Sequence, residues 1–202
     1  MTLDALRPAV KRILDPFVRT ADRLSLTPDH VSIVALVCAT GAAASFYLGG
    51  VDPWWYVIGA VFVFLNGWFD LIDGALARLQ NTASPSGDLL DHVLDRYADI
   101  VIIAGLAAGI ERYALGFLAV TGVLMTSYLG TQAQAVGLER VYGGLVGRAD
   151  RLAIIGIVAV IAAVLPAPLY GFTIIGWLLV GLAIVGHVTA IQRFVYSLQA
   201  LE

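Results

Sequence analysis

The chain has 202 residues, of which 59% are hydrophobic and only 13% are charged, and its formal net charge is −3. Soluble domains average roughly 45–50% apolar residues, so this composition excludes an ordinary soluble protein and indicates an integral membrane protein. A nucleic-acid partner would require a basic face, which the net negative charge excludes. The single cysteine, Cys38, excludes an intramolecular disulfide.

The N-terminal segment, residues 1–23, is predicted to form an amphipathic helix that lies at the membrane surface. Apolar residues fall on one side of this helix and basic residues fall elsewhere. The apolar residues are Leu3, Leu6, Val10, Leu14 and Phe17, and the basic residues are Arg7, Lys11, Arg12 and Arg19. This pattern is typical of helices that bind the interface of a bilayer with anionic headgroups. The alternative is a simple soluble lead-in to the first span.

Six apolar stretches follow, each about long enough to cross a bilayer. A hydrocarbon core of about 30 Å takes about 20 helical residues, and the long unbroken apolar runs exclude a β-barrel, the other fold that spans membranes. The stretches lie near residues 30–50, 54–74, 92–110, 113–134, 150–168 and 170–192. We therefore predict an all-α integral membrane domain of six transmembrane helices over residues 24–202.

Lysine and arginine residues gather at one end of these predicted spans. With the N-terminus inside the cell, the cytoplasmic segments hold eleven of the 12, and only Arg112 lies on the other side. The cytoplasmic residues are Arg7, Lys11, Arg12, Arg19, Arg23, Arg78, Arg96, Arg140, Arg148, Arg151 and Arg193. Basic residues favour the cytoplasmic side of a membrane. We therefore predict a multi-pass cell-membrane protein with both termini in the cytoplasm.

Four aspartates are set at helical spacing on either side of a predicted turn. Asp70 and Asp73 are three residues apart and Asp91 and Asp95 are four apart, so each pair occupies one helix face. The turn-rich segment 81–87 lets the chain reverse, so the two faces can meet on the cytoplasmic side. Acidic residues at a membrane are costly and indicate a functional site. Four carboxylates can bind two hard divalent cations, Mg²⁺ or Mn²⁺, and such a pair suits phosphoryl transfer.

The residues beside these aspartates fit a phosphate ligand. Gly74 and Ala77 are small and leave room for a ligand to approach the backbone. Arg78 can bind a phosphate in a bidentate manner. The alternative is that the two small residues serve helix packing and that Arg78 only neutralises the acids. His92 is predicted to be a satisfied polar neighbour rather than a ligand, which argues against a zinc site.

The complete string of residues resembles the signature of the CDP-alcohol phosphotransferase family. It reads D-x-x-D-G-x-x-A-R, eight residues, G-x-x-x-D-x-x-x-D, with Asp70, Asp73, Gly74, Ala77, Arg78, Gly87, Asp91 and Asp95 at the defined positions. The resemblance implies six transmembrane helices, a short N-terminal interfacial helix and a homodimer. It also implies transfer of a lipid phosphate group from CDP-diacylglycerol or CDP-archaeol to the hydroxyl of a polar alcohol, with release of CMP.

The same resemblance implies roles for individual residues. Asp70, Asp73 and Asp91 would bind the first metal ion, Asp70, Asp91 and Asp95 would bind the second, and Asp95 would also be the general base. The implied contacts to the CDP-lipid are Thr27, Pro28, Asp29, His30, Gly74, Arg78 and Ser84. Asp88 and Asp99 lie outside the signature, and we predict that they are polar residues of the helix or of its surroundings.

The acceptor alcohol is predicted from segments outside the signature. Residues 26–32, 127–137, 148–152 and 192–193 resemble the branch of phosphatidyl- and archaetidylinositol phosphate synthases. In that branch cationic side chains hold the phosphate of the acceptor, and Arg151 and Arg193 fall on two such positions. The chain departs from the branch after Tyr128, where Gly130, Gln132, Ala133 and Gln134 replace a basic residue and an Arg-Ala-Glu string. Inositol phosphate is favoured, and glycerol phosphate and serine are the alternatives.

Other interpretations of these residues stay open. Arg151 could serve positive-inside anchoring, and Arg193 could extend its charge to the lipid headgroups. The acids could instead belong to a divalent cation transporter, but that function predicts acids spread over several spans or over inverted repeats. Here they concentrate in one hairpin beside an arginine. A non-catalytic scaffold gives no reason for four acids at ligand spacing.

Overall fold

The computed structural model describes residues 7–139 and 146–202, which form seven α-helices and an isolated β-bridge between Leu169 and Phe172. The helices are α1 (Arg7–Arg23), α2 (Pro28–Gly49), α3 (Trp55–Gln80), α4 (Pro85–Gly109), α5 (Tyr113–Ala135), α6 (Arg148–Val164) and α7 (Ile174–Leu201). The predicted all-α class is confirmed. The side chains expected at Leu3, Leu6, Arg7, Val10, Lys11 and Arg140 lie outside the described part of the chain.

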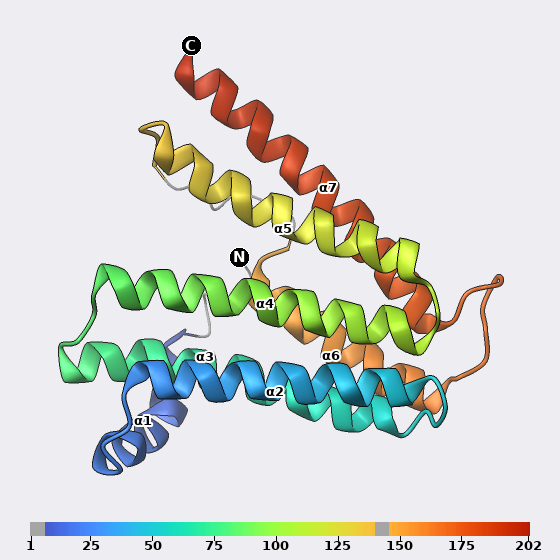
Figure 1. Cartoon of the computed structure of the whole chain (residues 1–202), viewed down its shortest axis with the longest axis horizontal. Coiled ribbons are helices and arrows are strands. Elements are labelled where there is room, and N and C mark those ends of the chain that lie inside the picture. Colours follow the sequence, from blue (N-terminus) through green and yellow to red (C-terminus); the bar gives the residue numbers. More distant parts are fainter. Residues whose placement is uncertain (1–6, 140–145) are drawn as a thin grey trace.

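Four of these helices, α2, α3, α5 and α7, are long and apolar enough to cross a membrane. Helix α6 has 17 residues, and α4 carries acidic and basic residues through its first half. The six-span arrangement therefore stays a prediction. Figure 1 shows α2, α3 and α4 running side by side, with α6 behind them and with α5 and α7 extending away as a second group.

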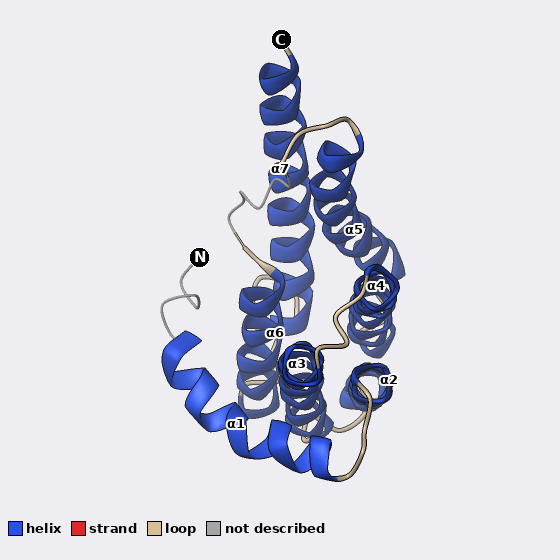
Figure 2. Cartoon of the chain, turned by 90° about the vertical axis from the view of Figure 1, so that its left-hand side faces the viewer, coloured by secondary structure: helices blue, strands red, loops and turns tan. Residues whose placement is uncertain are grey.

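Helix α1 crosses the end of the bundle and packs on α3 (Figure 2). Its residues Leu14 and Val18 are buried against Ile72 and Leu76. Phe17 remains 51% exposed. We expected Leu14 and Phe17 to lie on the same apolar side of the helix. In the structure, Leu14 is buried in the protein core and Phe17 lies on the surface. Placement of this helix in the membrane interface stays a prediction.

Side-chain caps fix where α2 and α4 begin. The Thr27 hydroxyl accepts a hydrogen bond from the backbone N–H of His30 at 3.3 Å, and the His30 Nδ1 accepts one from the backbone N–H of Thr27 at 3.4 Å. The Ser84 hydroxyl caps α4 by accepting from the backbone N–H of Gly87 at 3.2 Å. Asn81, in the left-handed conformation at φ 54°, ends α3. These caps allow the sharp reversal that brings the two aspartate pairs to one end of the bundle.

Small residues let α2 and α4 approach closely. A Cβ atom at Gly105 would lie 2.4 Å from the carbonyl oxygen of Ala43, and one at Gly109 would lie 2.3 Å from that of Phe46. Because the clashing atoms belong to backbone, a side chain at either position would force the helices apart. This geometry supports the close packing expected of glycines in membrane helices.

Replacing Gly105 by Ala should therefore destabilise the protein by about 1–3 kcal/mol, the usual cost of overpacking a tight contact. The matched control is Gly156→Ala on α6, where an added Cβ atom has no heavy atom within 4 Å. Because Ala favours a helix over Gly by about 1 kcal/mol, the control should be neutral or slightly stabilising. Melting temperatures in detergent would compare the two variants, and equal values would contradict the close contact.

Candidate active site

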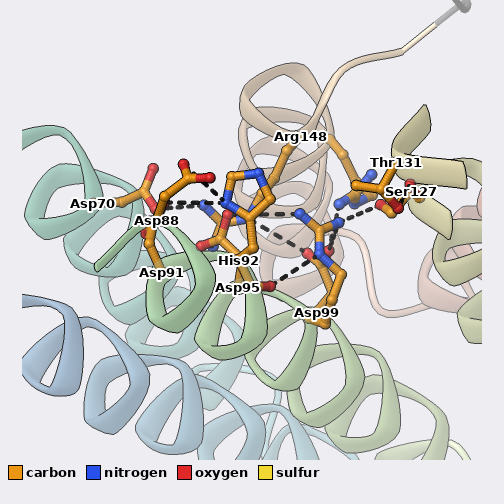
Figure 3. A network of polar contacts seen from close by, with 11 residues as sticks. Asp70, Asp88, Asp91, His92, Asp95, Asp99, Ser127, Thr131 and Arg148 are labelled. Carbon is orange, nitrogen blue, oxygen red and sulfur yellow. Dashed lines mark hydrogen bonds and ion pairs between the residues drawn. The ribbon is translucent and has the colours of Figure 1, made fainter. Parts of the chain in front are cut away.

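Three carboxylates from two helices converge at the end of the bundle. Oxygen atoms of Asp70 on α3 and of Asp91 and Asp95 on α4 all lie within 4.8 Å of one another. All three side chains are partly exposed, so a ligand can reach them. Figure 3 shows these residues pointing toward one another from neighbouring helix turns. Oxygen atoms alone form the donor set, which is the ligand chemistry that Mg²⁺ and Mn²⁺ prefer.

The fourth predicted ligand, Asp73, faces a different helix. Its side chain is only 5% exposed, and its Oδ2 accepts a hydrogen bond of 2.7 Å from the Ser32 hydroxyl on α2. The converging group therefore contains three of the four aspartates, and Asp73 joins α3 to α2 directly behind it. The ligand role of all four aspartates stays a prediction.

Arg148, at the first position of α6, inserts its guanidinium among the carboxylates. Its Nη1 lies 2.7 Å from the Oδ1 of Asp70, and its Nη2 lies 2.8 Å from the Oδ1 of Asp95. Arg148 was predicted as one of the cytoplasmic basic residues, and no contact with the aspartates was expected. A positive group that bonds to two of the three carboxylates shows that the site favours a cation, which fits the binding of divalent metal ions.

Asp99 connects this site to a second group of arginines. Its side chain is 2% exposed, and its carboxylate lies 2.6 Å from the Nη2 of Arg151, 3.5 Å from the Nη1 of Arg96 and 3.9 Å from the Nε of Arg148. A buried carboxylate requires such compensation. The prediction that Asp99 is only a surrounding polar residue misses this function as the common partner of three arginines.

The arginines predicted to hold the acceptor lie beside these contacts. Arg151 is 6% exposed and is held by Asp99. Arg193 donates a hydrogen bond of 2.6 Å from its Nη1 to the backbone carbonyl of Thr126. Thr126 and Arg151 line the same cavity. Arg96, which no sequence pattern singled out, donates to the hydroxyl of Ser127 on α5.

His92 differs from the prediction of a satisfied polar neighbour. Its Nδ1 lies 3.7 Å from a carboxylate oxygen of Asp88 and 3.7 Å from one of Asp91, which is beyond hydrogen-bond distance. Neither ring nitrogen has a hydrogen-bond partner within the described ranges. Both of these carboxylates come from the same helix as His92.

The residues predicted to contact the CDP group gather at the same end of the molecule. The start of α2, the end of α3 and the start of α4 meet there, at the left of Figure 1. They supply the predicted contacts Thr27, Pro28, Asp29, His30, Gly74, Arg78 and Ser84, and also the small signature residues Ala77 and Gly87. The Arg78 side chain folds back toward Gly74, whose added Cβ atom would lie 3.5 Å from the Arg78 Nη1. Thr27 and Ser84 also cap helices, so their conformations are fixed without a ligand.

Comparison with known proteins identifies relatives over the whole chain. Residues 25–190 match the model of the CDP-alcohol phosphatidyltransferase family. The archaetidylinositol phosphate synthase of Methanothermobacter thermautotrophicus is 33% identical over 205 residues, which cover 99% of this chain and 96% of that protein. The phosphatidylinositol phosphate synthase of Mycolicibacterium smegmatis is 34% identical and covers 93% of this chain and 84% of its own length.

Solved structures show the same fold. A crystal structure of Mycobacterium tuberculosis phosphatidylinositol phosphate synthase in complex with manganese and citrate has a TM-score of 0.77 and 26% identity, covering 91% of this chain and 88% of that one. The structure of the same enzyme with CDP-DAG bound has a TM-score of 0.76 and 28% identity, covering 92% and 94%. The resemblance in the aspartate signature is confirmed. The chain belongs to the CDP-alcohol phosphatidyltransferase family and is a transferase of phospholipid biosynthesis.

Proposed function

We propose that this protein transfers a phosphatidyl or archaetidyl group from a CDP-linked lipid to the hydroxyl of inositol phosphate and releases CMP. The main observation behind this proposal is that two charged sites lie next to each other. Asp99 and Arg148 connect the converging carboxylates to the buried guanidinium of Arg151. One site suits a pyrophosphate with its metal ions, and the other suits a second phosphate. The relatives named as inositol phosphate synthases support the same assignment.

The proposed metal ligands are Asp70, Asp73, Asp91 and Asp95, for two Mg²⁺ or Mn²⁺ ions. The convergence of three of these carboxylates supports the assignment, as does the manganese complex of a structural relative. When bound, the ions would stabilise negative charge on the attacked phosphate and on the leaving CMP. Arg148 neutralises Asp70 and Asp95 in the structure described here, so this arginine keeps the carboxylates together and oriented.

Asp95 is the proposed general base. The acceptor hydroxyl must lose its proton as its oxygen bonds to the phosphorus that carries the lipid, while the bond from that phosphorus to the CMP oxygen breaks. Asp95 lies at the centre of the site, where its Oδ1 accepts from Arg148 and its Oδ2 lies 3.6 Å from the Arg96 Nη2. Without metal ions these two arginines hold the carboxylate in place.

The CDP group is proposed to bind at the exposed end of α2, α3 and α4. Arg78 presents an exposed guanidinium above Gly74, where it can bind a phosphate in a bidentate manner. The first turns of α2 and α4 both begin at this end, and helix N-termini attract anions. The donor nucleotide would then lie on one side of the carboxylates, with Arg151 on the other side.

A phosphorylated acceptor is favoured over serine because of the charge at the second site. Arg151 is buried, and its Nε has no hydrogen-bond partner among the residues described. A buried guanidinium donor without a partner is costly, and a phosphate oxygen would satisfy it. Serine carries a singly charged carboxylate and no phosphate, so it would neutralise the arginines of this site less completely than a phosphorylated acceptor.

The deciding experiment measures CMP release by the purified protein in detergent with Mn²⁺ or Mg²⁺. The donors are CDP-diacylglycerol and CDP-archaeol, and each is tested with inositol phosphate, glycerol phosphate and serine. We expect the highest rate with inositol phosphate. A higher rate with serine would overturn the acceptor assignment while leaving the reaction class intact.

The variant Arg151→Gln should raise the KM for inositol phosphate by about tenfold or more, because a charge-assisted hydrogen bond contributes about 1.5–3 kcal/mol. The KM for the CDP-lipid should change little. Arg19→Gln is the matched control, because Arg19 is an exposed arginine of α1. If both KM values rise equally, Arg151 supports the fold of the site rather than the acceptor.

The six-span arrangement, the cytoplasmic position of the site and a homodimer also belong to this proposal. The clustering of eleven of the 12 basic residues at one end of the spans supports the orientation. A cation transporter is the competing function. Mn²⁺ flux through liposomes that contain the protein and no CDP-lipid would favour transport over the transferase reaction.

A further inference from the structure

An elongated cavity of about 400 Å³ lies between α5, α6 and α7. Its volume falls within the range of pockets that bind small molecules. Apolar side chains line most of it, among them Val158 from α6 and Trp177, Leu182 and Val185 from α7. The lining residues of α7 run from Ile174 to Thr189, a rise of about 22 Å along the helix. A space of this length and polarity fits a hydrocarbon chain.

One end of the cavity is polar, and two buried side-chain atoms there lack hydrogen-bond partners among the described residues. Thr189 is 1% exposed, and its hydroxyl has no hydrogen-bond partner within residues 7–139 and 146–202. Arg151 is 6% exposed, and its Nε is also unpartnered within these ranges. Leaving a buried polar group unsatisfied costs about 1–3 kcal/mol. Both residues line the cavity, so rotation of their side chains toward it would let oxygen atoms of a ligand headgroup satisfy these two groups.

The polar end is connected to the converging carboxylates. Arg151 binds Asp99, which lies 3.9 Å from the Nε of Arg148, and Arg148 binds Asp70 and Asp95. The cavity therefore begins beside the reaction site and extends away from it along α6 and α7. The proposed CDP contacts lie on α2, α3 and α4, whereas α5 and α7 extend away from these helices in Figure 1.

We propose that this cavity holds one hydrocarbon chain of the lipid product and is the path by which the product leaves for the bilayer. The inference rests on the proposed function. The donor lipid carries its CDP group, which is assigned to α2, α3 and α4. The product instead carries the acceptor phosphate, which is the headgroup that matches Arg151 and Thr189. Only after transfer do a hydrocarbon chain and this phosphate belong to one molecule.

The test uses phosphatidylinositol phosphate with a photoreactive diazirine in one hydrocarbon chain, added to metal-free protein in detergent. We expect labelling of α6 and α7 at the cavity. Unlabelled phosphatidylinositol phosphate should compete severalfold better than phosphatidylcholine with the same chains. Equal competition by the two lipids, or labelling confined to α2 and α3, would overturn the inference.

A pair of glycine variants tests the cavity itself. Gly181 lines it, and an added Cβ atom there has no heavy atom within 4 Å, so Gly181→Leu should fill the space without moving the backbone. Gly156→Leu on α6 is the matched control, because Gly156 is equally open and is not among the lining residues. Gly181→Leu should lower labelling severalfold and slow steady-state turnover, while the rate of a single turnover is kept.

The two proposals can fail separately. Labelling needs no turnover, so specific labelling of a protein that is inactive with inositol phosphate would overturn the proposed acceptor and leave the cavity as a binding site for a lipid chain. Normal activity with equal labelling in the two glycine variants would overturn only the product path.

Discussion

Replacing Asp95 by Asn should slow CMP release by about 10²–10⁴-fold, the usual contribution of a general base. The amide has nearly the same shape as the carboxylate, but it cannot accept the proton of the acceptor hydroxyl. Mn²⁺ binding should persist with reduced affinity, because Asp70 and Asp91 keep their oxygen atoms at the site. The measurements are the rate of CMP release at saturating substrates and Mn²⁺ binding by electron paramagnetic resonance.

Asp88→Asn is the matched control for this substitution. Asp88 lies on the same helix, its side chain is 75% exposed, and it is 3.7 Å from the His92 ring. The change in charge is identical, but Asp88 is outside the converging carboxylates, so activity should be nearly unchanged. Equal losses in the two variants would assign the effect to net charge near the site and would contradict a general-base function for Asp95.

The main helices were predictable because each depends on a local pattern. Apolar runs of about 20 residues placed α2, α3, α5 and α7, and capping residues fixed the starts of α2 and α4. The ends were less predictable. Helix α3 continues to Gln80, beyond the expected end of the apolar span at residue 74, and ends where Asn81 adopts the left-handed conformation. Helix α6 ends at Val164 rather than residue 168, because Pro166 and Pro168 cannot continue it.

The candidate site was only partly predictable because its arginines come from distant segments. The aspartates can be recognised from their spacing in the sequence. Arg148 and Asp70 are 78 residues apart and come together only because α6 packs on α3. The position of Asp99 within a predicted span could have indicated its arginine partners. A carboxylate within a predicted span requires a buried cation, and arginines at the start of the fifth span were available to supply it.

Replacing Arg148 by Gln should destabilise the metal-free protein by as much as about 3–5 kcal/mol, the cost of removing one partner from a largely buried ion pair. Its guanidinium lies 2.7 Å from Asp70 and 2.8 Å from Asp95, and without it these carboxylates repel each other. Bound Mn²⁺ would supply the missing positive charge. Mn²⁺ should therefore bind the variant more tightly and stabilise it more than the wild type, since the stabilisation by a ligand rises with the logarithm of its affinity for the folded state.

Melting temperatures in detergent, measured with a chelator and then with increasing Mn²⁺, give the comparison. Arg19→Gln, which removes the same charge from an exposed position on α1, should leave both the melting temperature and its Mn²⁺ dependence unchanged. If Arg148→Gln lowers the melting temperature equally with and without Mn²⁺, Arg148 stabilises the helix packing and does not occupy the place of a metal ion.

A larger Mn²⁺ effect would instead mean that Arg148 must leave Asp70 and Asp95 when the metal binds. The freed guanidinium then has one described carboxylate left nearby, Asp99, the residue that also holds Arg151. Metal binding would in this way strengthen the positive charge beside the acceptor.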